Sequence, residues 1–228
     1  SADSAPRFHS SPIKLRSSTP RNVTVCGVLL AMLTDILSSA LDLTLPRRFA
    51  AMEAAPATPA MSLRAERSRM GMPTITPSLW FNGNLEEAAQ FYTSVFPNSS
   101  IEQFNRYTEA GPGAPGELVS GTFVLDGTRF VGINGGAEFP FTEAVSFVVR
   151  CDSQDEVDHY WGRLVDGGEE SQCGWLKDRF GLSWQIVPER LFELIGDPDP
   201  ARAAAATAAM LGMRKIVIAE LEAAVGSA

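Results

Sequence analysis

The same order of expected elements occurs twice along this chain, with a period of about 70 residues. Each copy begins with a strand, continues through an amphipathic helix and ends with strands that are joined by turns. The first copy is expected to contain strands at 75–81, 101–107, 118–125 and 129–133 and a helix at 85–96. The second copy is expected to contain strands at 144–150, 170–176 and 182–187 and a helix at 154–165. Such a repeat indicates an internal duplication and an α+β fold rather than a doubly wound parallel sheet.

Turn-forming and capping residues mark the boundaries of these elements. The turn 82–84 (Asn-Gly-Asn) is expected to supply the N-cap of the first helix, and Asp152 or Ser153 that of the second. Asp126-Gly127 is a hairpin signal, and 178–181 is expected to be a turn between the last two strands.

A helical tail is expected after Pro188. A short helix is predicted at 189–195, and Asp197-Pro198-Asp199-Pro200 places acids and proline at the start of a second helix over 201–213. A third helix is predicted over 217–224. Apolar side chains on one face indicate that the tail, 189–228, docks on the domain or on a partner subunit.

Residues 1–71 differ in composition and are expected to be a poorly ordered or weakly helical extension. They are rich in Ser, Ala, Pro and Arg, with one apolar stretch at 23–45 behind several basic residues. This stretch faintly resembles a signal or transit segment, whereas Asp35 and Asp42 argue against a membrane span. The interpretation that we favour is sequence upstream of a natural start at Met70 or Met72. A short helix within 29–43 fits the spacing of the apolar residues.

Charge and cysteine content narrow the classes of partner. Residues 71–228 carry ten Lys and Arg against 22 Asp and Glu, a balance of −12, which repels nucleic acid. The three cysteines are widely spaced and include no C-x-x-C pair, which suits a reducing cytoplasm and argues against a zinc site. We therefore expect a cytoplasmic protein without nucleic-acid or membrane partners.

Several stretches resemble a known family. These are 75–81 (ITPSLWF), 86–92 (EEAAQFY), 134–136 (NGG), 173–188 (CGWLKDRFGLSWQIVP) and 197–200 (DPDP). They are similar to the PhnB-like proteins labelled 3-demethylubiquinone-9 3-methyltransferase, within the vicinal-oxygen-chelate superfamily of glyoxalases, bleomycin-resistance proteins and dioxygenases. The resemblance spans about Thr74 to Ala224 and implies two βαβββ modules that form a curled mixed sheet around a cleft at 72–188.

The resemblance also implies positions for a divalent metal ion, which such proteins hold with His, Glu or Gln from the inner strands. The first histidine would fall near Thr76 or Pro77, the second near Ala144, and the carboxylate on Gln185. None of these is a strong ligand, and His159 lies on the expected second helix. We therefore predict no metal and no cofactor, and we keep a metal-dependent lyase or dioxygenase as an alternative.

The methyltransferase label rests on the family name alone. S-adenosylmethionine is usually held by a glycine-rich loop that leads from a strand into a helix. The segment 134–136 is glycine-rich, but it is expected to close the first copy and not to enter a helix. Methylation of a ubiquinone precursor is therefore the second alternative.

The best candidates for binding a ligand are Trp80, Asn134, Phe141, Trp175 and Gln185. The aromatic residues fit a cleft for a small aromatic or hydrophobic molecule, and they equally fit ordinary core packing. Gln185 fits either a ligand contact or the satisfaction of buried backbone groups. No catalytic residue is identified. The leading hypothesis is a PhnB-like, metal-free, ligand-binding homodimer, and whether it is an enzyme is open.

Overall fold

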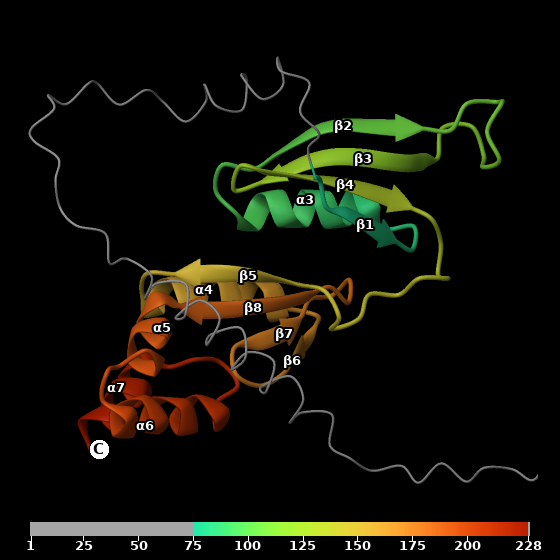
Figure 1. Cartoon of the computed structure of the whole chain (residues 1–228). Helices are drawn as coiled ribbons and strands as arrows, with labels where there is room; N and C mark the ends of the chain where they lie inside the picture. The colour runs from blue at the N-terminus through green and yellow to red at the C-terminus, as the bar shows by residue number, and fades with distance from the viewer. Residues whose placement is uncertain (1–74, 228) are drawn as a thin grey trace, which may run out of the picture.

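The computed structural model describes residues 75–227, so the expectations for residues 1–71 lie outside the described part of the chain. Two modules follow one another, and each contains a four-stranded mixed sheet and a helix (Figure 1). The predicted α+β fold with two βαβββ modules and a helical tail is confirmed. Among the described helices, none is long and apolar enough to cross a membrane.

The first module comprises β1 (Ser78–Phe81), α3 (Leu85–Val95), β2 (Ser100–Arg106), β3 (Leu118–Leu125) and β4 (Thr128–Asn134). Its strand order is β1-β4-β3-β2, with β1 parallel to β4 and the other pairs antiparallel. Leu79 and Phe81 are buried on the side of α3, while the alternate residue Trp80 is half-buried on the other side. The core of this module therefore lies between the sheet and α3.

The second module repeats this plan with β5 (Ser146–Cys151), α4 (Gln154–Val165), β6 (Glu169–Glu170), β7 (Trp175–Lys177) and β8 (Ser183–Pro188). Its strand order is β5-β8-β7-β6, with β5 parallel to β8 and the other pairs antiparallel. Ser153 caps α4 by accepting a bond from the Glu156 backbone, and the Glu156 side chain accepts one from the Asp152 backbone. The predicted cap is thus confirmed at Ser153.

The two sheets remain separate hydrogen-bonded ladders, and the modules meet through their helix-facing sides. Figure 1 shows α3 between the first sheet and the second module. One apolar cluster runs through both modules and includes Phe81, Phe123, Trp161 and Trp184. The outer faces of the two sheets therefore point away from this shared core.

The tail docks on the second module. It consists of α5 (Glu189–Ile195), α6 (Pro200–Leu211) and α7 (Ile218–Gly226). A separate apolar cluster joins these helices to Cys173, Trp175 and Val187. The backbone N–H groups of Cys173 and Gly174 donate to the carbonyls of Met213 and Arg214, over 2.8 and 2.7 Å. Of the two docking partners expected for the tail, the structure describes contacts with the domain.

Two local expectations were wrong. The segment expected as one strand at 170–176 is instead a hairpin, in which β6 and β7 pair antiparallel. Cys173 and Gly174 lie in its turn with φ values of 58° and 84°, and their N–H groups bond the tail. Asn84 occupies the N-cap position of α3 but makes no side-chain capping bond. Instead the Asn134 Oδ1 accepts from the Leu85 N–H, over 3.0 Å. A side chain from β4, distant in sequence, therefore replaces the local cap.

Candidate ligand site

One face of the second sheet collects polar side chains from three neighbouring strands. Gln185 lies opposite Trp175 in the β7–β8 register, and Ser183 opposite Ser146 in the β5–β8 register. Because side chains alternate along a strand, these four residues share the outer face, while Trp184 points to the shared core. The turn of the β6–β7 hairpin at 173–174 precedes Trp175 and therefore leaves this alternation intact.

Several polar atoms on this face lack a hydrogen-bond partner. The Gln185 Nε2 donates to the Ser146 Oγ over 2.8 Å. Within the described part of the chain, the Gln185 Oε1, the Ser183 Oγ and the Trp175 Nε1 have no partner. Gln185 and Ser183 are each 1% exposed and Trp175 is 5% exposed. An unpaired buried polar group costs about 1–3 kcal/mol, so three of them on one face form an unusual concentration of unmet hydrogen bonds.

The tail holds Trp175 in place on this face. Trp175 belongs to the apolar cluster with Met213 and Ile216. At the adjacent Gly174, a Cβ atom would lie 2.8 Å from the Ile186 carbonyl oxygen and 3.3 Å from the Ile216 side chain. Only glycine permits this close approach at positive φ, so the backbone that presents Trp175 is clamped between β8 and the tail.

Trp80 and Phe141 lie at a different place. Both line a hollow of about 320 Å³ together with Phe139 and the turn residue Phe180. The Trp80 and Phe139 rings meet edge to face at 5.0 Å between centroids, as do Phe81 and Phe141 at 5.4 Å. The Trp80 Nε1 donates to the Gly136 carbonyl over 2.8 Å. This aromatic hollow sits beside the connection between the modules.

Asn134 has a structural position. Its Oδ1 caps α3 and its Nδ2 donates to the Leu118 carbonyl over 3.1 Å. It borders a more polar hollow of about 490 Å³ with Arg106 and Glu86, which pair with each other. The five predicted residues thus fall into three places: Trp175 and Gln185 share a sheet face, Trp80 and Phe141 share a hollow, and Asn134 borders another hollow.

The residues at the expected metal positions do not fit a divalent ion. Thr76 and Pro77 precede β1, Ala144 precedes β5, and the outer face of β8 carries hydroxyl and amide oxygens without a carboxylate or imidazole. No group of three His, Cys, Asp or Glu among the described residues is placed to hold an ion. His159 is exposed on α4, where its ring packs against Tyr160.

The glycine-rich segment after β4 also differs from a methyl-donor loop. The chain leaves Asn134 through irregular structure and enters β5 without an intervening helix. A Cβ atom at Gly135 would lie 1.9 Å from the Trp80 ring, so glycine is needed here for packing. The segment therefore closes the first module without entering a helix, as the sequence predicts.

Sequence reasoning missed three residues that contribute polar atoms. Ser146 and Ser183 carry no motif, although Ser183 is two positions before Gln185 and so shares its face. Asp178, expected only as part of a turn, is buried and accepts bonds from Tyr92, Trp184 and two backbone N–H groups. Burial raises the pKa of the Asp178 carboxyl, and the four donors act in the opposite direction.

The comparison with protein-family models identifies one family. The model of the family described as 3-demethylubiquinone-9 3-methyltransferase matches residues 73–187. None of the curated proteins matches the chain. A PhnB protein from Bacillus cereus, described as a putative 3-demethylubiquinone-9 3-methyltransferase, is 37% identical over 51% of this chain and 99% of its own, with a TM-score of 0.47.

Two more distant structures are also similar. A protein from Pseudomonas aeruginosa is 21% identical over 52% of this chain and 98% of its own, with a TM-score of 0.44. FosX, a fosfomycin resistance protein from Listeria monocytogenes, is 16% identical over 52% of this chain and 93% of its own, with a TM-score of 0.40. Another FosX structure is a complex with Mn(II) and sulfate. The family match ends at Val187, so α5, α6 and α7 lie beyond it.

Proposed function

Because the chain belongs to the 3-demethylubiquinone-9 3-methyltransferase family, we propose that it binds a small aromatic or hydrophobic molecule on the outer face of the second sheet, without a metal ion. The observation that carries this proposal is the set of three buried polar atoms without partners, on Trp175, Ser183 and Gln185. A ligand that bonded all three would offset a cost that the fold otherwise bears.

The donor and acceptor pattern limits the chemistry of the ligand. The Trp175 N–H can only donate, the Gln185 Oε1 can only accept, and the Ser183 hydroxyl can do either. A planar molecule with two neighbouring oxygens, one accepting and one donating, matches this pattern. The Trp175 ring would pack against its apolar part.

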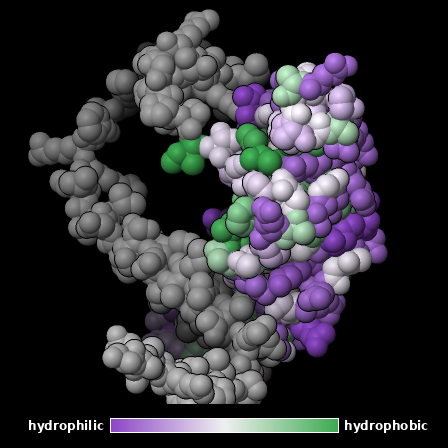
Figure 2. Space-filling view, turned by 90° about the vertical axis from the view of Figure 1, so that its right-hand side faces the viewer, coloured by the Kyte–Doolittle hydropathy of each residue, from purple (hydrophilic) through white to green (hydrophobic). Residues whose placement is uncertain are grey.

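A homodimer is part of the proposal. β1 and β5 are edge strands, and Val145 and Val148 beside the β5 edge are 60% and 46% exposed. Figure 2 shows a mainly hydrophilic surface with a few hydrophobic residues on the side where the β2–β3 and β4–β5 connections lie. A second copy that covered the β5 edge would bury these valines. Val148→Asp should then shift the mass measured by sedimentation equilibrium towards that of a monomer.

The decisive test compares stability with binding in one variant. Ser183→Ala removes an unpaired hydroxyl, so we expect an unchanged or higher free energy of unfolding. The same change should weaken the binding of catechol, used as a probe with two adjacent oxygens, by about fivefold or more. Phenol, which lacks the second oxygen, should bind equally to both proteins. If the variant is destabilised, or binds catechol like the wild type, the hydroxyl is not a ligand group.

A control for this test is Ser146→Ala, because Ser146 has a partner. It accepts the 2.8 Å bond from Gln185, so its removal should cost about 1 kcal/mol of unfolding free energy. A gain of stability in Ser183→Ala together with a loss in Ser146→Ala separates unpaired from paired hydroxyls on one sheet face.

The family description favours a second candidate, methyl transfer to a ubiquinone precursor. Calorimetry that showed saturable binding of S-adenosylmethionine would support methyl transfer. If no heat of binding is detected at millimolar S-adenosylmethionine, methyl transfer is excluded. The Mn(II) complex of FosX favours a third, metal-dependent lyase or dioxygenase chemistry. Near-stoichiometric iron, zinc or manganese in the purified protein would replace the metal-free proposal.

A further inference from the structure

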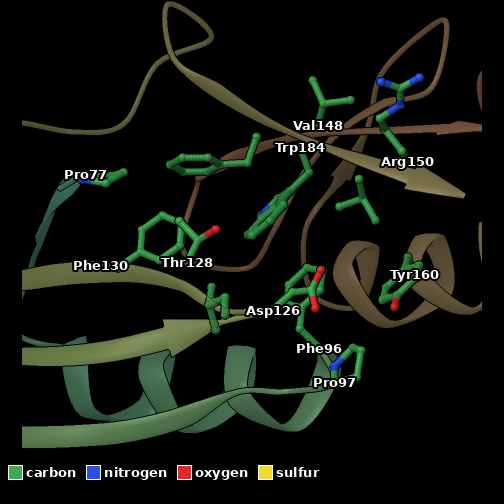
Figure 3. Close-up of a pocket in the computed structure, with 13 residues that line it drawn as sticks. Pro77, Phe96, Pro97, Asp126, Thr128, Phe130, Val148, Arg150, Tyr160 and Trp184 are labelled. Carbon is green, nitrogen blue, oxygen red and sulfur yellow. The ribbon is translucent and has the colours of Figure 1, made fainter. Parts of the chain in front are cut away.

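A separate hollow of about 540 Å³ opens between the two modules (Figure 3). It is lined by the start of β4, by the edge strand β5 and by residues at the end of α3 and on α4. Phe130 and Trp184, which line it, belong to the core shared by the modules. Most of the lining therefore lies on the helix-facing side of both sheets, while Val148 and Arg150 of the edge strand β5, which share the face of Gln185, form part of its rim.

A continuous series of aromatic rings forms its floor. Phe96 stacks on Tyr160 at 5.4 Å between centroids and on Trp184 at 5.2 Å, with interplanar angles of 18° and 28°. Phe147 contacts Trp184 at 5.6 Å and Phe130 at 5.1 Å. Figure 3 shows the Trp184 ring projecting into the space between the strands. Cavities of about 300–1,000 Å³ with such walls are typical of small-molecule sites.

The charges around the hollow do not balance. Arg150 lines it, but its guanidinium pairs with Glu189, lies 4.8 Å from the centre of the Phe192 ring and points away from the hollow in Figure 3. Asp126 is exposed and forms no ion pair with any described residue. The Asp126 carboxylate accepts a 3.4 Å hydrogen bond from the neutral Asn98 amide, so among the described residues its charge has no cation beside it at the aromatic floor.

The Tyr160 hydroxyl adds a polar group at the same place. It makes no hydrogen bond to the residues that the structure describes, and Tyr160 is half-buried. Burial is the main cause that raises the pKa of Tyr160, followed by Glu156, Cys151 and Asp126 in that order. The hydroxyl stays neutral at physiological pH and remains able to accept or donate.

From these contacts we infer a second ligand site between the modules, which takes an aromatic amine in its ammonium form. The ring of such a molecule would pack on Phe96 and Trp184, and its ammonium would lie near the Asp126 carboxylate and over an aromatic face. We infer a positive charge on the ligand because Arg150 at the rim is already paired with Glu189, whereas Asp126 forms no ion pair with a described residue. This site is independent of the proposed site on the outer face of the second sheet.

The experiment uses three probes of similar shape and different charge: phenethylamine, phenethyl alcohol and 3-phenylpropionate. Calorimetry and tryptophan fluorescence report binding to the whole chain, since the ring of Trp184 lines the hollow. The amine should bind several-fold more tightly than the alcohol, and the carboxylate should bind most weakly. Equal affinities for amine and alcohol, or no saturable binding of the amine at millimolar concentration, would overturn the inference.

Three variants locate the binding. Asp126→Asn should weaken the binding of phenethylamine by about three- to fivefold and leave the affinity for phenethyl alcohol unchanged. Asparagine tolerates the φ of 42° at this position. Thr128→Trp, at an exposed lining position, should remove binding of both probes by filling the hollow. Glu87→Gln removes an exposed acid that does not line the hollow and should change neither.

Ser183→Ala separates this inference from the proposed function. It alters the outer face of the second sheet and should leave the affinity for phenethylamine unchanged. A loss of amine binding in Ser183→Ala with no effect of Asp126→Asn would place the amine on the outer face and refute the second site.

Discussion

Removal of the Tyr92 hydroxyl tests whether one hydrogen bond joins the two modules. Tyr92 lies on α3 of the first module and donates over 2.7 Å to the Oδ2 of Asp178 in the second. Both residues are buried, at 0% and 3% exposure. Burial and the adjacent Asp178 carboxylate raise the pKa of Tyr92 well above its usual value, so its hydroxyl remains a donor over the whole working range of pH.

Tyr92→Phe keeps the ring and its aromatic contacts and removes only the donor. A hydrogen bond to a charged group contributes about 1.5–3 kcal/mol, and we expect this loss of unfolding free energy. Asp178 would keep its bonds from Trp184 and from the backbone of Phe180 and Leu182, so the protein should still fold. A domain is stable by only about 5–15 kcal/mol, which makes the change easy to measure.

Urea unfolding followed by circular dichroism measures this change, with Tyr160→Phe as the matched control. The Tyr160 hydroxyl bonds no described residue, so its removal should stay within about 0.5 kcal/mol. If both variants unfold at the same urea concentration as the wild type, the bond between Tyr92 and Asp178 does not stabilise the contact between the modules.

Four further outcomes follow from single positions. Gly135→Ala should lower the free energy of unfolding by about 1–3 kcal/mol, measured by thermal unfolding, because its Cβ would meet the Trp80 ring. Gly162→Ala in α4, which has open space around it, should raise the free energy of unfolding by about 0.5–1 kcal/mol. Burial and the acids around it raise the pKa of Cys151 to about 12, so mass spectrometry should find its thiol unmodified by iodoacetamide at neutral pH until the protein is unfolded. Asp199→Ala should cost about 1 kcal/mol of unfolding free energy because Asp199 caps α6, and a Tm equal to that of the wild type would contradict this role.

Much of the fold was readable from local patterns. Helical spacing of apolar residues located α3 and α4, and Asp126-Gly127 located the β3–β4 hairpin. These signals act over a few residues, so they survive without knowledge of the rest of the chain. The prediction of one strand over 170–176 was wrong because this segment turns back on itself as the β6–β7 hairpin. The N–H groups of its turn bond the carbonyls of Met213 and Arg214, about 40 residues away, which no local pattern indicates.

The candidate site was only partly predictable. Alternation along β8 indicates that Ser183 and Gln185 share a face, but the number of residues between β7 and β8 does not reveal whether Trp175 joins them. Asn134 was predicted to contact the ligand, and it belongs to the segment 134–136 that resembles the family. The structure uses its amide to cap α3 and to bond Leu118, so its two polar atoms are already occupied.

Periodicity and residue chemistry are local properties, so the order of the elements, the duplication and the weak ligands at the expected metal positions can be inferred from the sequence. Which polar atoms find partners depends instead on how distant segments pack together. The bond between Tyr92 and Asp178 spans 86 residues and the cap from Asn134 to Leu85 spans 49. The same packing leaves the Gln185 Oε1 without a partner in the described part of the chain. Hydrogen bonds over such separations depend on how the modules and the tail pack, and no local pattern encodes that packing.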